Sequence, residues 1–319
     1  MVIAEVEGDV AEIVDIAIVG GGPAGLTAAL YGARGRAHTV VFEAGLPGGQ
    51  IVTASWVENY PGFPEGVSGE ELGDLFVKQA KIAGAEFRTL SGVESIRKDG
   101  CDYVLGLDGE EVTARVVILA TGAVPKKLGV PGEATFAGRG VSWCATCDAP
   151  LFRDKVVAVL GGGDAATQEA LFLTKYATHV HLIHRRDELR ATECIQERCF
   201  INPKITIHWS QTVQEIVGKD GKVSGLKLRS TKDGAEDVLP VDGVFIFVGV
   251  DPQSALIRGL CELDEAGFVK VDPNGLTSSP GLYAAGDVTD YELKQVVTAC
   301  ARGAFAAYHA LHYIDSRAC

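Results

Sequence analysis

Two cysteines with two residues between them, Cys144 and Cys147, carry the most reactive side chains of the sequence, and Asp148 follows them directly. Thiols at this spacing can close a small disulfide ring, and such pairs commonly contain one thiol with a lowered pKa. One interpretation is therefore a redox disulfide. The other is half of a zinc site completed by Cys194 and Cys199, although structural zinc usually takes its four ligands from two tight knuckles.

The first element that could position a cofactor lies at residues 15–44, which predict a strand, a glycine turn, an alanine-rich helix and a second strand ending on Glu43. The turn reads Gly20-x-Gly22-x-x-Gly25. Glycine allows the tight turn, the approach of a pyrophosphate to the backbone and the packing of the helix on the strand. Glu43 follows Gly20 at nearly the spacing of an acid that binds a ribose, ~20 residues. This βαβ unit predicts dinucleotide binding.

The same plan recurs at residues 155–185, with the turn Gly161-x-Gly163-x-x-Ala166. Where the first copy has its acid, the second has four basic residues, namely His184, Arg185, Arg186 and Arg190. A carboxylate there would bind a 2′-hydroxyl and repel a 2′-phosphate, whereas cations favour NADP over NAD. The alternative is a solvated, basic start of a helix.

Each βαβ unit is followed by short strands that Asp-Gly pairs separate, a hairpin signal, at residues 93–122 and 213–249. The sequence thus predicts an α/β fold with two Rossmann-like, three-layer nucleotide-binding domains, each with a β-meander. A Pro- and Gly-rich stretch at 123–133 predicts a linker. The last 70 residues are too few for a further domain, so the first domain is expected to be discontinuous. The predicted domains are residues 1–122 with 250–319, and residues 123–249.

Composition limits the kinds of partner. The 319 residues are 47% hydrophobic and 22% charged, and their net charge of −13 argues against a nucleic-acid surface. Residues 16–33 are uncharged, but a Gly-Gly-Gly-Pro turn in their middle argues against a membrane span. Eight cysteines without a basic leader segment favour a reducing compartment, so a cytoplasmic location is expected.

Taken together, these motifs resemble the low-molecular-weight thioredoxin reductases over nearly the whole chain. The ordered motifs are GGGPAG (20–25), GGQ (48–50), VENYPGF (57–63), CATCD (144–148), GGGDAA (161–166), HRRDELR (184–190) and AAGDV (284–288). A larger class of pyridine nucleotide-disulfide oxidoreductases carries its redox cysteines just after the first βαβ unit. Here they precede the NADP motif, which selects the smaller class.

The resemblance implies two cofactors, FAD on residues 1–122 and 250–319 and NADPH on residues 123–249. The residues expected at FAD are Gly20, Gly22, Pro23, Ala24, Gly25, Glu43, Gly49, Gln50, Asn59, Thr121, Gly122, Gly286, Asp287, Gln295 and Val296. Those expected at NADPH are Gly161, Gly163, Asp164, Ala165, His184, Arg185, Arg186 and Arg190. No metal is expected.

The resemblance also implies a relay in which NADPH reduces the flavin and the flavin reduces a Cys144–Cys147 disulfide. Cys147 would lie next to the isoalloxazine, Cys144 would attack the disulfide of thioredoxin or a thioredoxin-like protein, and Asp148 would move the proton. A homodimer is implied as well. So is a rotation of one domain against the other about the two crossings.

Alternatives remain at this point. A flavin dithiol oxidase of the same fold, or a relative fed by ferredoxin, would not need the arginine cluster, and a zinc-stabilised nucleotide-binding sensor would have no flavin. Lys294-Gln295-Val296 replaces the frequent Arg-Gln-Ala near the flavin, and Ala149-Pro150 follows the CxxC motif where many members have Gly and an aromatic residue. These departures leave partner specificity open.

Overall fold

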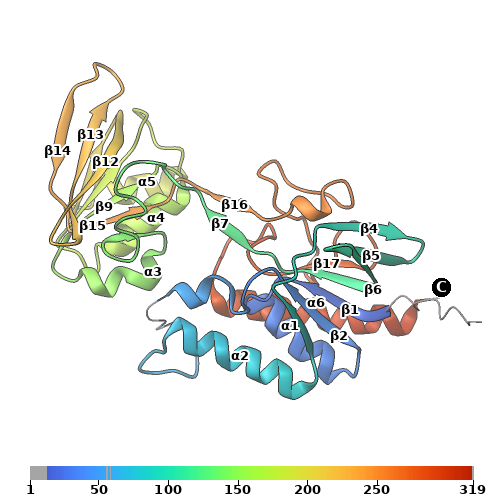
Figure 1. Ribbon diagram of the computed structural model, residues 1–319. Coiled ribbons are helices and arrows are strands. Elements are labelled where there is room, and N and C mark those ends of the chain that lie inside the picture. Colours follow the sequence, from blue (N-terminus) through green and yellow to red (C-terminus); the bar gives the residue numbers. More distant parts are fainter. Residues whose placement is uncertain (1–12, 55–56, 58, 318–319) are drawn as a thin grey trace, which may run out of the picture. The chain divides into compact units, whose positions relative to one another are not determined.

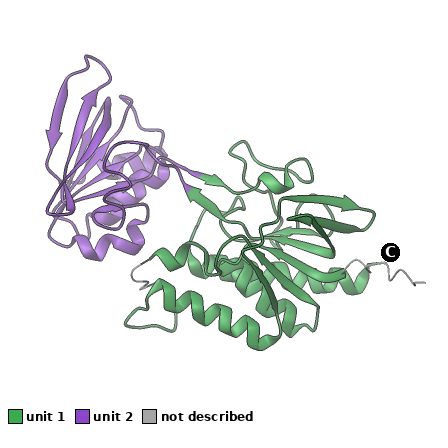
Figure 2. Cartoon of the chain, viewed as in Figure 1, with its two compact units in different colours: residues 1–124, 251–319 green, residues 125–250 purple. Residues whose placement is uncertain are grey.

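The computed structural model describes residues 13–54, 57 and 59–317. The chain divides into two compact units, of which unit 1 holds the described residues up to 124 and from 251 onward, and unit 2 holds residues 125–250 (Figure 2). Unit 1 is thus discontinuous along the chain. Which unit holds which cofactor stays a prediction.

A seven-stranded sheet forms the centre of unit 1 (Figure 1). Its order is β3 (Glu86–Thr89), β2 (Thr39–Glu43), β1 (Ile13–Val19), β6 (Glu110–Leu119), β5 (Asp102–Leu107) and β4 (Ser95–Asp99), and β17 (Leu282–Ala284) also pairs with β6. Strands β1, β2, β3, β6 and β17 are mutually parallel, whereas β4, β5 and β6 form an antiparallel meander. β6 therefore belongs to both parts, pairing with β5 along its first half and with β1 further on.

Strand β1 shows why unit 1 has three layers. Ile16 and Ile18 belong to the core shared with the helices, whereas Ala17 and Val19 belong to the core shared with the meander. A parallel strand covered on both faces needs such a nearly continuous apolar run. The helices of this unit are α1 (Pro23–Arg34), α2 (Gly69–Ala83) and α6 (Val296–Ser316), with short 3₁₀ turns at η1 (Gly49–Thr53) and η3 (Ala255–Ile257).

Unit 2 repeats the plan with a separate meander. Its parallel sheet has the order β11 (Ile205–His208), β10 (His179–Ile183), β9 (Val156–Leu160), β15 (Gly243–Ile246) and β8 (Val141–Ser142). The meander is β12 (Gln211–Lys219), β13 (Lys222–Ser230) and β14 (Glu236–Leu239), and the helices are α3 (Ala145–Asp148), η2 (Ala149–Phe152), α4 (Asp164–Leu173) and α5 (Glu193–Phe200). One core lies between sheet and helices and a second between sheet and meander. The predicted α/β class, with two three-layer units and two meanders, is confirmed.

The predicted hairpin turns are present where the Asp-Gly pairs stand. Asp108 and Gly109 have φ angles of 37° and 88°, and Asp220 and Gly221 have 54° and 78°. Two successive positive φ angles match the right-handed twist of the flanking strands, and Asp-Gly adopts them at low cost.

The predicted linker, residues 123–133, was too long. β7 (Ala123–Pro125) carries the chain from unit 1 into unit 2, and it pairs with β16 (Val250–Pro252), which carries the chain back. Residues 126–133 belong to unit 2. Leu128 packs against the core between the sheet and the meander. The buried Glu133 carboxylate accepts hydrogen bonds from the Leu128 and Gly129 amides at 3.0 and 2.8 Å. Gly and Pro mark turns, but they do not reveal whether the turns are packed.

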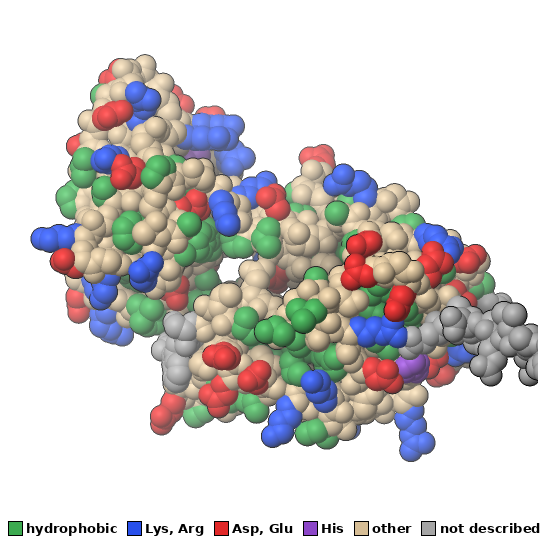
Figure 3. Space-filling view, viewed as in Figure 1, with side chains coloured by type: hydrophobic (Ala, Val, Ile, Leu, Met, Phe, Trp, Pro, Cys, Tyr) green, Lys and Arg blue, Asp and Glu red, His purple; other side chains and the backbone are tan. Residues whose placement is uncertain are grey.

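The surface in Figure 3 carries acidic and basic side chains interspersed with one another. In the described part of the chain, no helix has an apolar stretch of the length that a bilayer requires.

Candidate active site

Cys144 and Cys147 form a disulfide at the start of α3, with their Cα atoms 5.3 Å apart. Both side chains are partly exposed. The redox-pair interpretation is thus supported, and neither thiolate is available to a metal in this state. Of the pair that would have completed a zinc site, Cys194 is exposed and Cys199 is buried. Within the described ranges, no group of three or more His, Cys, Asp or Glu side chains could hold a metal ion.

Ser142, which the sequence analysis did not single out, organises this motif from the end of β8. Its hydroxyl oxygen accepts a hydrogen bond from the Cys144 amide at 3.0 Å and lies 3.2 Å from the Cys144 carbonyl. It also hydrogen-bonds the Asp148 carboxyl group, which lowers the pKa of Asp148, but burial outweighs this and raises that pKa overall. Asp148 therefore keeps its proton to a higher pH than an exposed aspartate, as a proton donor to a sulfur needs. In the sequence, the feature that could have identified Ser142 is a short polar side chain two residues before Cys144.

The glycine turn of unit 1 leaves no room for side chains on its protein side. A Cβ on Gly20 would lie 2.5 Å from the Ala120 carbonyl oxygen, and one on Gly25 would lie 1.9 Å from that of Gly20. Gly22 caps α1 without a side-chain hydrogen bond, and Pro23 occupies the first turn. The first-turn amides of α1 are thus free of a side-chain cap, which suits a pyrophosphate at the helix N-terminus.

Glu43 is fixed at the end of β2 by two backbone amides. Its carboxylate accepts hydrogen bonds from Gly21 at 2.7 Å and from Gly45 at 2.8 Å. A carboxylate offers about four lone-pair sites, so acceptor capacity remains for ribose hydroxyls. The geometry fits the predicted contact.

A second glycine loop lies directly against the first. The Gly48 amide donates to the Gly21 carbonyl at 2.7 Å, and a Cβ on Gly49 would lie 2.7 Å from the Gly22 Cα. Next to it, the Gln50 amide nitrogen donates to the Ala123 carbonyl. Two turns that touch through bare backbone form the kind of cradle in which a pyrophosphate can approach the chain.

Residues 284–295, which are distant in the sequence, lie against the same two glycine turns. Gly286, with φ of 78°, would place a Cβ 2.8 Å from that of Ala24 in α1. The Asn59 amide donates to the Gln295 side-chain oxygen at 3.0 Å, although 236 residues separate them. Burial raises the pKa of Asp287, and the nearby Lys294 charge opposes that rise. Gln295 and Thr298 form a capping box before α6, which begins at Val296.

Thr121 and Gly122 follow the end of β6, within unit 1. The Thr121 hydroxyl donates to the Gln253 carbonyl at 2.6 Å, and Gly122 has a φ of 72°. Unit 1 therefore brings together glycine turns, a fixed acid and the start of α6, a donor set that fits a dinucleotide such as FAD.

The glycine turn of unit 2 differs from that of unit 1 because the His184 side chain packs against it. A Cβ on Gly161 would lie 2.5 Å from the Phe247 carbonyl oxygen, and one on Gly162 would lie 2.2 Å from the Nδ1 of His184. Gly163, the N-cap of α4, has no atom within 4 Å of that position. Asp164 accepts a hydrogen bond from the Thr192 amide at 2.6 Å. The following residue, Ala165, is exposed in the first turn of α4, so the turn is closed toward the protein and open toward a ligand.

His184 supports this turn from behind, since its side chain is buried against Gly162. Its Nε2 has no hydrogen-bond partner among the described residues. Burial lowers the pKa of His184, and the positive charges of Arg190 and Arg186 lower it further. The imidazole is therefore neutral at pH 7, and the arginines supply the positive charge.

The side chains of Arg185, Arg186 and Arg190 are exposed. Their backbone is fixed, because the Arg190 amide donates to the Gly162 carbonyl at 2.7 Å and the Arg186 carbonyl accepts from the Ser210 amide at 2.9 Å. None of the three guanidinium groups has an acidic partner within the part of the chain that the structure covers. This arrangement fits a 2′-phosphate, for which planar guanidinium groups are well suited.

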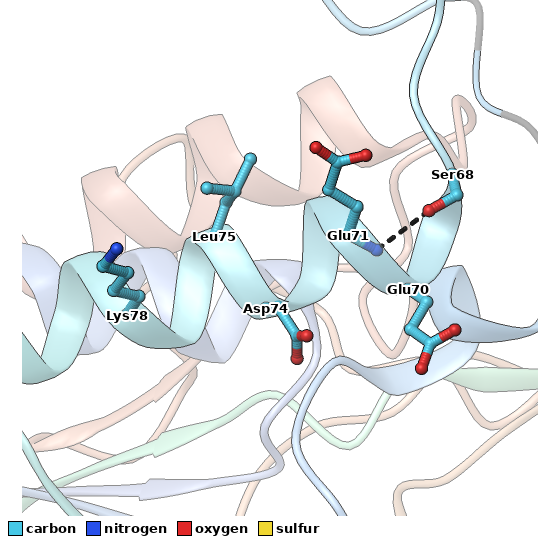
Figure 4. A pocket seen from close by; sticks show the side chains of 6 residues that line it. All are labelled: Ser68, Glu70, Glu71, Asp74, Leu75 and Lys78. Carbon is cyan, nitrogen blue, oxygen red and sulfur yellow. Dashed lines mark hydrogen bonds between the residues drawn. The ribbon is translucent and has the colours of Figure 1, made fainter.

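A shallow surface hollow elsewhere in unit 1 runs along α2 from its N-cap, Ser68, to Lys78 (Figure 4). Its lining residues are Ser68, Glu70, Glu71, Asp74, Leu75 and Lys78, and Ser68 caps the helix by accepting from the Glu71 amide at 3.1 Å. None of the predicted site residues lines it.

Comparison with known proteins agrees with this geometry. Residues 14–303 match the family described as pyridine nucleotide-disulphide oxidoreductase. The sequence is 44% identical to the thioredoxin reductase of Listeria monocytogenes over 305 residues, 95% of each chain. It is 46% identical to that of Peptoclostridium litorale over 311 residues, 95% of this chain and 98% of the relative. The crystal structure of thioredoxin reductase from Streptococcus pyogenes matches 96% of this chain and 99% of its own, with a TM-score of 0.88 and 40% identity. The resemblance drawn from the ordered motifs is confirmed.

Proposed function

Because the chain belongs to the pyridine nucleotide-disulphide oxidoreductase family, we propose that it is an NADPH-dependent flavoprotein that reduces the disulfide of thioredoxin or of a thioredoxin-like protein. The observation that carries this proposal is the Cys144–Cys147 disulfide, which lies in unit 2, with η2 and β9 between it and the second glycine turn. A redox disulfide in a chain that also contains two nucleotide-binding folds is typical of a disulfide reductase.

In this proposal unit 1 holds FAD and unit 2 holds NADPH. When bound, the flavin supplies an acceptor for the hydride of NADPH and a two-electron donor for the disulfide. The chain's own part in unit 1 is to receive the pyrophosphate on the Gly20–Gly25 and Gly48–Gly49 backbone and the ribose on Glu43. In unit 2, the Gly161–Gly163 turn receives the second pyrophosphate.

The cysteines carry out the reaction with the protein substrate. The Cys144 thiolate attacks one sulfur of the substrate disulfide, forming a mixed disulfide and releasing the other sulfur as a thiolate. Cys147 then attacks Cys144, which restores the Cys144–Cys147 disulfide and releases the second substrate sulfur. Cys144 gives up its proton when the thiolate forms and Cys147 gives up its proton in the second step, and one proton ends on each of the two substrate sulfurs. Asp148, whose pKa is raised by burial, lies next to Cys147 in the chain, and its carboxyl group can take up and return a proton during these steps.

A flavin dithiol oxidase of the same fold is the alternative. Such an enzyme passes electrons to oxygen and does not need a 2′-phosphate site. The guanidinium groups of Arg185, Arg186 and Arg190, which have no acidic partner among the described residues, therefore favour the NADPH-dependent reductase. The homodimer and the cytoplasmic location stay predictions.

The decisive experiment is an anaerobic titration of the purified protein, followed in the visible spectrum. We expect a bound flavin that NADPH bleaches at lower concentration than NADH and that oxidised thioredoxin then restores. Cys144→Ser and Cys147→Ser should each keep reduction of the flavin by NADPH and lose reduction of thioredoxin. Reoxidation by oxygen alone, with thioredoxin inert, would instead establish the dithiol oxidase. A colourless protein would contradict both.

A further inference from the structure

Thr146, between the two cysteines of the redox motif, has its side-chain hydroxyl beside the sulfur of Cys144. The Thr146 Oγ1 lies 3.4 Å from the Cys144 Sγ, within hydrogen-bonding distance for a sulfur atom. In the Cys144–Cys147 disulfide this sulfur carries no proton, so the hydroxyl is the donor and the sulfur is the acceptor. One of the two reacting sulfurs therefore already has a hydroxyl donor beside it.

The single turn of α3 fixes the backbone on both sides of this contact. Ala145 is fully buried, in the same core as Ala166 and Ala170 of α4. The Cys144 amide donates to the Ser142 hydroxyl at 3.0 Å. Threonine is β-branched and has few χ1 rotamers, so its hydroxyl loses little freedom on making a hydrogen bond. Packing of the turn thus keeps donor and sulfur together.

The two sulfurs of the disulfide differ in their surroundings. Cys144 has the Thr146 hydroxyl, whereas no hydroxyl or amide group among the described residues donates to the Cys147 Sγ. A hydrogen bond to a charged acceptor is stronger than one to a neutral acceptor, so a donor favours the thiolate over the thiol. When the disulfide is opened, negative charge is therefore favoured on Cys144. The thiolate is the form that attacks a disulfide.

We propose that Thr146 is a catalytic residue, whose hydroxyl donates a hydrogen bond to the Cys144 thiolate and so makes Cys144 the sulfur that attacks the protein substrate. This inference rests on the proposed function. The hydroxyl keeps its own proton throughout. It stabilises the thiolate before the attack and makes a weaker hydrogen bond once the Cys144 sulfur belongs to the mixed disulfide, so the exchange described above balances unchanged.

The test is the rate at which iodoacetamide alkylates Cys144 in the holoenzyme, between pH 6 and pH 9.5. Cys147→Ser serves as the background, because it leaves the Cys144 thiol unpaired. Mass spectrometry of the Cys144 peptide separates its alkylation from that of the exposed Cys194.

The variants in this background differ only in one hydroxyl group. Thr146→Val and Thr146→Ala remove the hydroxyl, and Thr146→Ser keeps it. Thr178→Val is the matched control, since it removes another hydroxyl of unit 2, which donates to the Lys155 carbonyl at 3.0 Å.

Removal of the hydroxyl should change the rate in opposite directions at low and high pH. Loss of one charge-assisted hydrogen bond should lower the thiolate fraction about tenfold at low pH. The more basic thiolate is about threefold more nucleophilic, because nucleophilicity rises with basicity. We therefore expect Thr146→Val and Thr146→Ala to be alkylated about threefold more slowly than wild type at pH 6 and faster, by up to about threefold, at pH 9.5. Thr146→Ser and Thr178→Val should stay within about twofold of wild type throughout.

The other titratable groups of this region do not produce such a crossover. They are Asp148 on the same turn and Asp164 and Glu169 on α4, which packs against it, whereas η2 and β8 carry no charged residue. All three carboxyl groups are present in every variant, so their titration affects wild type and variant alike. The comparison at each pH therefore isolates the hydroxyl.

The enzyme with both cysteines supplies a second measurement. Thr146→Val should lower kcat/KM for thioredoxin about threefold or more at pH 6, and Thr146→Ser should restore it. Flavin reduction by NADPH should stay within about twofold of wild type, because it precedes the attack on the protein substrate.

Several results would overturn the inference while leaving the proposed function intact. These are a wild-type alkylation profile in both variants that lack the hydroxyl, a loss that is the same at every pH, or a Thr146→Ser variant that behaves like Thr146→Val. Failure of both Thr146→Val and Thr146→Ala to fold, judged by far-UV circular dichroism, would also overturn it, since Thr146 would then serve the fold. A wild-type enzyme that does not reduce thioredoxin would instead contradict the proposed function, on which the alkylation rates do not depend.

Discussion

The double substitution Arg185→Gln and Arg186→Gln should change the preference for NADPH over NADH without disturbing the rest of unit 2. Both side chains are exposed and have no acidic partner in the described structure, while only their backbone groups hold the surrounding loop together. Glutamine keeps the first three carbon atoms and the polar character of the side chain and removes the charge. Folding should therefore be unaffected.

The expected rise in the KM for NADPH can be worked out from the solvent exposure of the two guanidinium groups. A unit charge pair at about 4 Å is worth about 1 kcal/mol in bulk water, and hydrogen bonds to charged groups are worth about 1.5–3 kcal/mol. For two exposed guanidinium groups on one phosphate we take about 1–1.5 kcal/mol each, or about 2–3 kcal/mol in all. At about 1.4 kcal/mol per factor of ten, the KM for NADPH should rise roughly 30-fold to 150-fold. NADH has no 2′-phosphate, so its KM should stay within about twofold.

The assay is anaerobic flavin reduction with each nucleotide over a range of concentrations, at low and high salt. The control Arg198→Gln with Lys219→Gln removes two exposed charges elsewhere in unit 2 and should leave the selectivity unchanged. At about 1 M salt, screening should narrow the difference between wild type and variant. If the KM values for NADPH and NADH rose by the same factor, the guanidinium groups would not recognise the 2′-phosphate and the reasoning would be refuted.

Three further predictions use the same geometry. Gly25→Ala would place a Cβ 1.9 Å from the Gly20 carbonyl oxygen, so it should cost about 2 kcal/mol of stability or more and lose FAD; an unchanged melting temperature of the apoprotein would contradict this. Gly163→Ala meets no atom within 4 Å, so its melting temperature should match wild type while the KM for NADPH rises at least about tenfold, because a side chain would occupy cofactor space. Burial raises the pKa of Asp148, so the folded state binds the proton of this carboxyl group more tightly than the unfolded chain does. The folded state therefore loses stability as pH rises from the ordinary pKa of an aspartate to the raised pKa of Asp148. As pH rises from 4 to 7, wild type should therefore lose stability relative to Asp148→Asn, which the difference between their melting temperatures at the two pH values measures. The same variant should slow thioredoxin reduction about 100-fold or more. A variant with wild-type pH dependence of the melting temperature would contradict the burial argument.

The sequence alone was sufficient wherever the signal is local. The strand, glycine turn and helix of each βαβ unit fall within about 30 residues, and the periodicity and the glycines must agree there for the unit to form at all. The same holds for the Cys144–Cys147 pair and for the Asp-Gly hairpins, whose conformations are set by neighbours in the chain. The arginine cluster could be predicted by comparing the two βαβ units, because it stands at the end of the second unit where the first unit has Glu43.

Tertiary structure decided what depends on packing between distant residues. The sequence assigned the stretch after Pro125 to a linker, yet Glu133 folds it onto unit 2. His184 was expected to bind the cofactor among the cations, but it is buried behind Gly162 and hence neutral, which only its surroundings could reveal. Asn59 and Gln295 were assigned to the flavin by resemblance alone, and the fold brings them into contact. Burial and electrostatic fields arise from residues far apart in the chain, so the pKa values of Asp148 and Asp287 have no signature in the sequence.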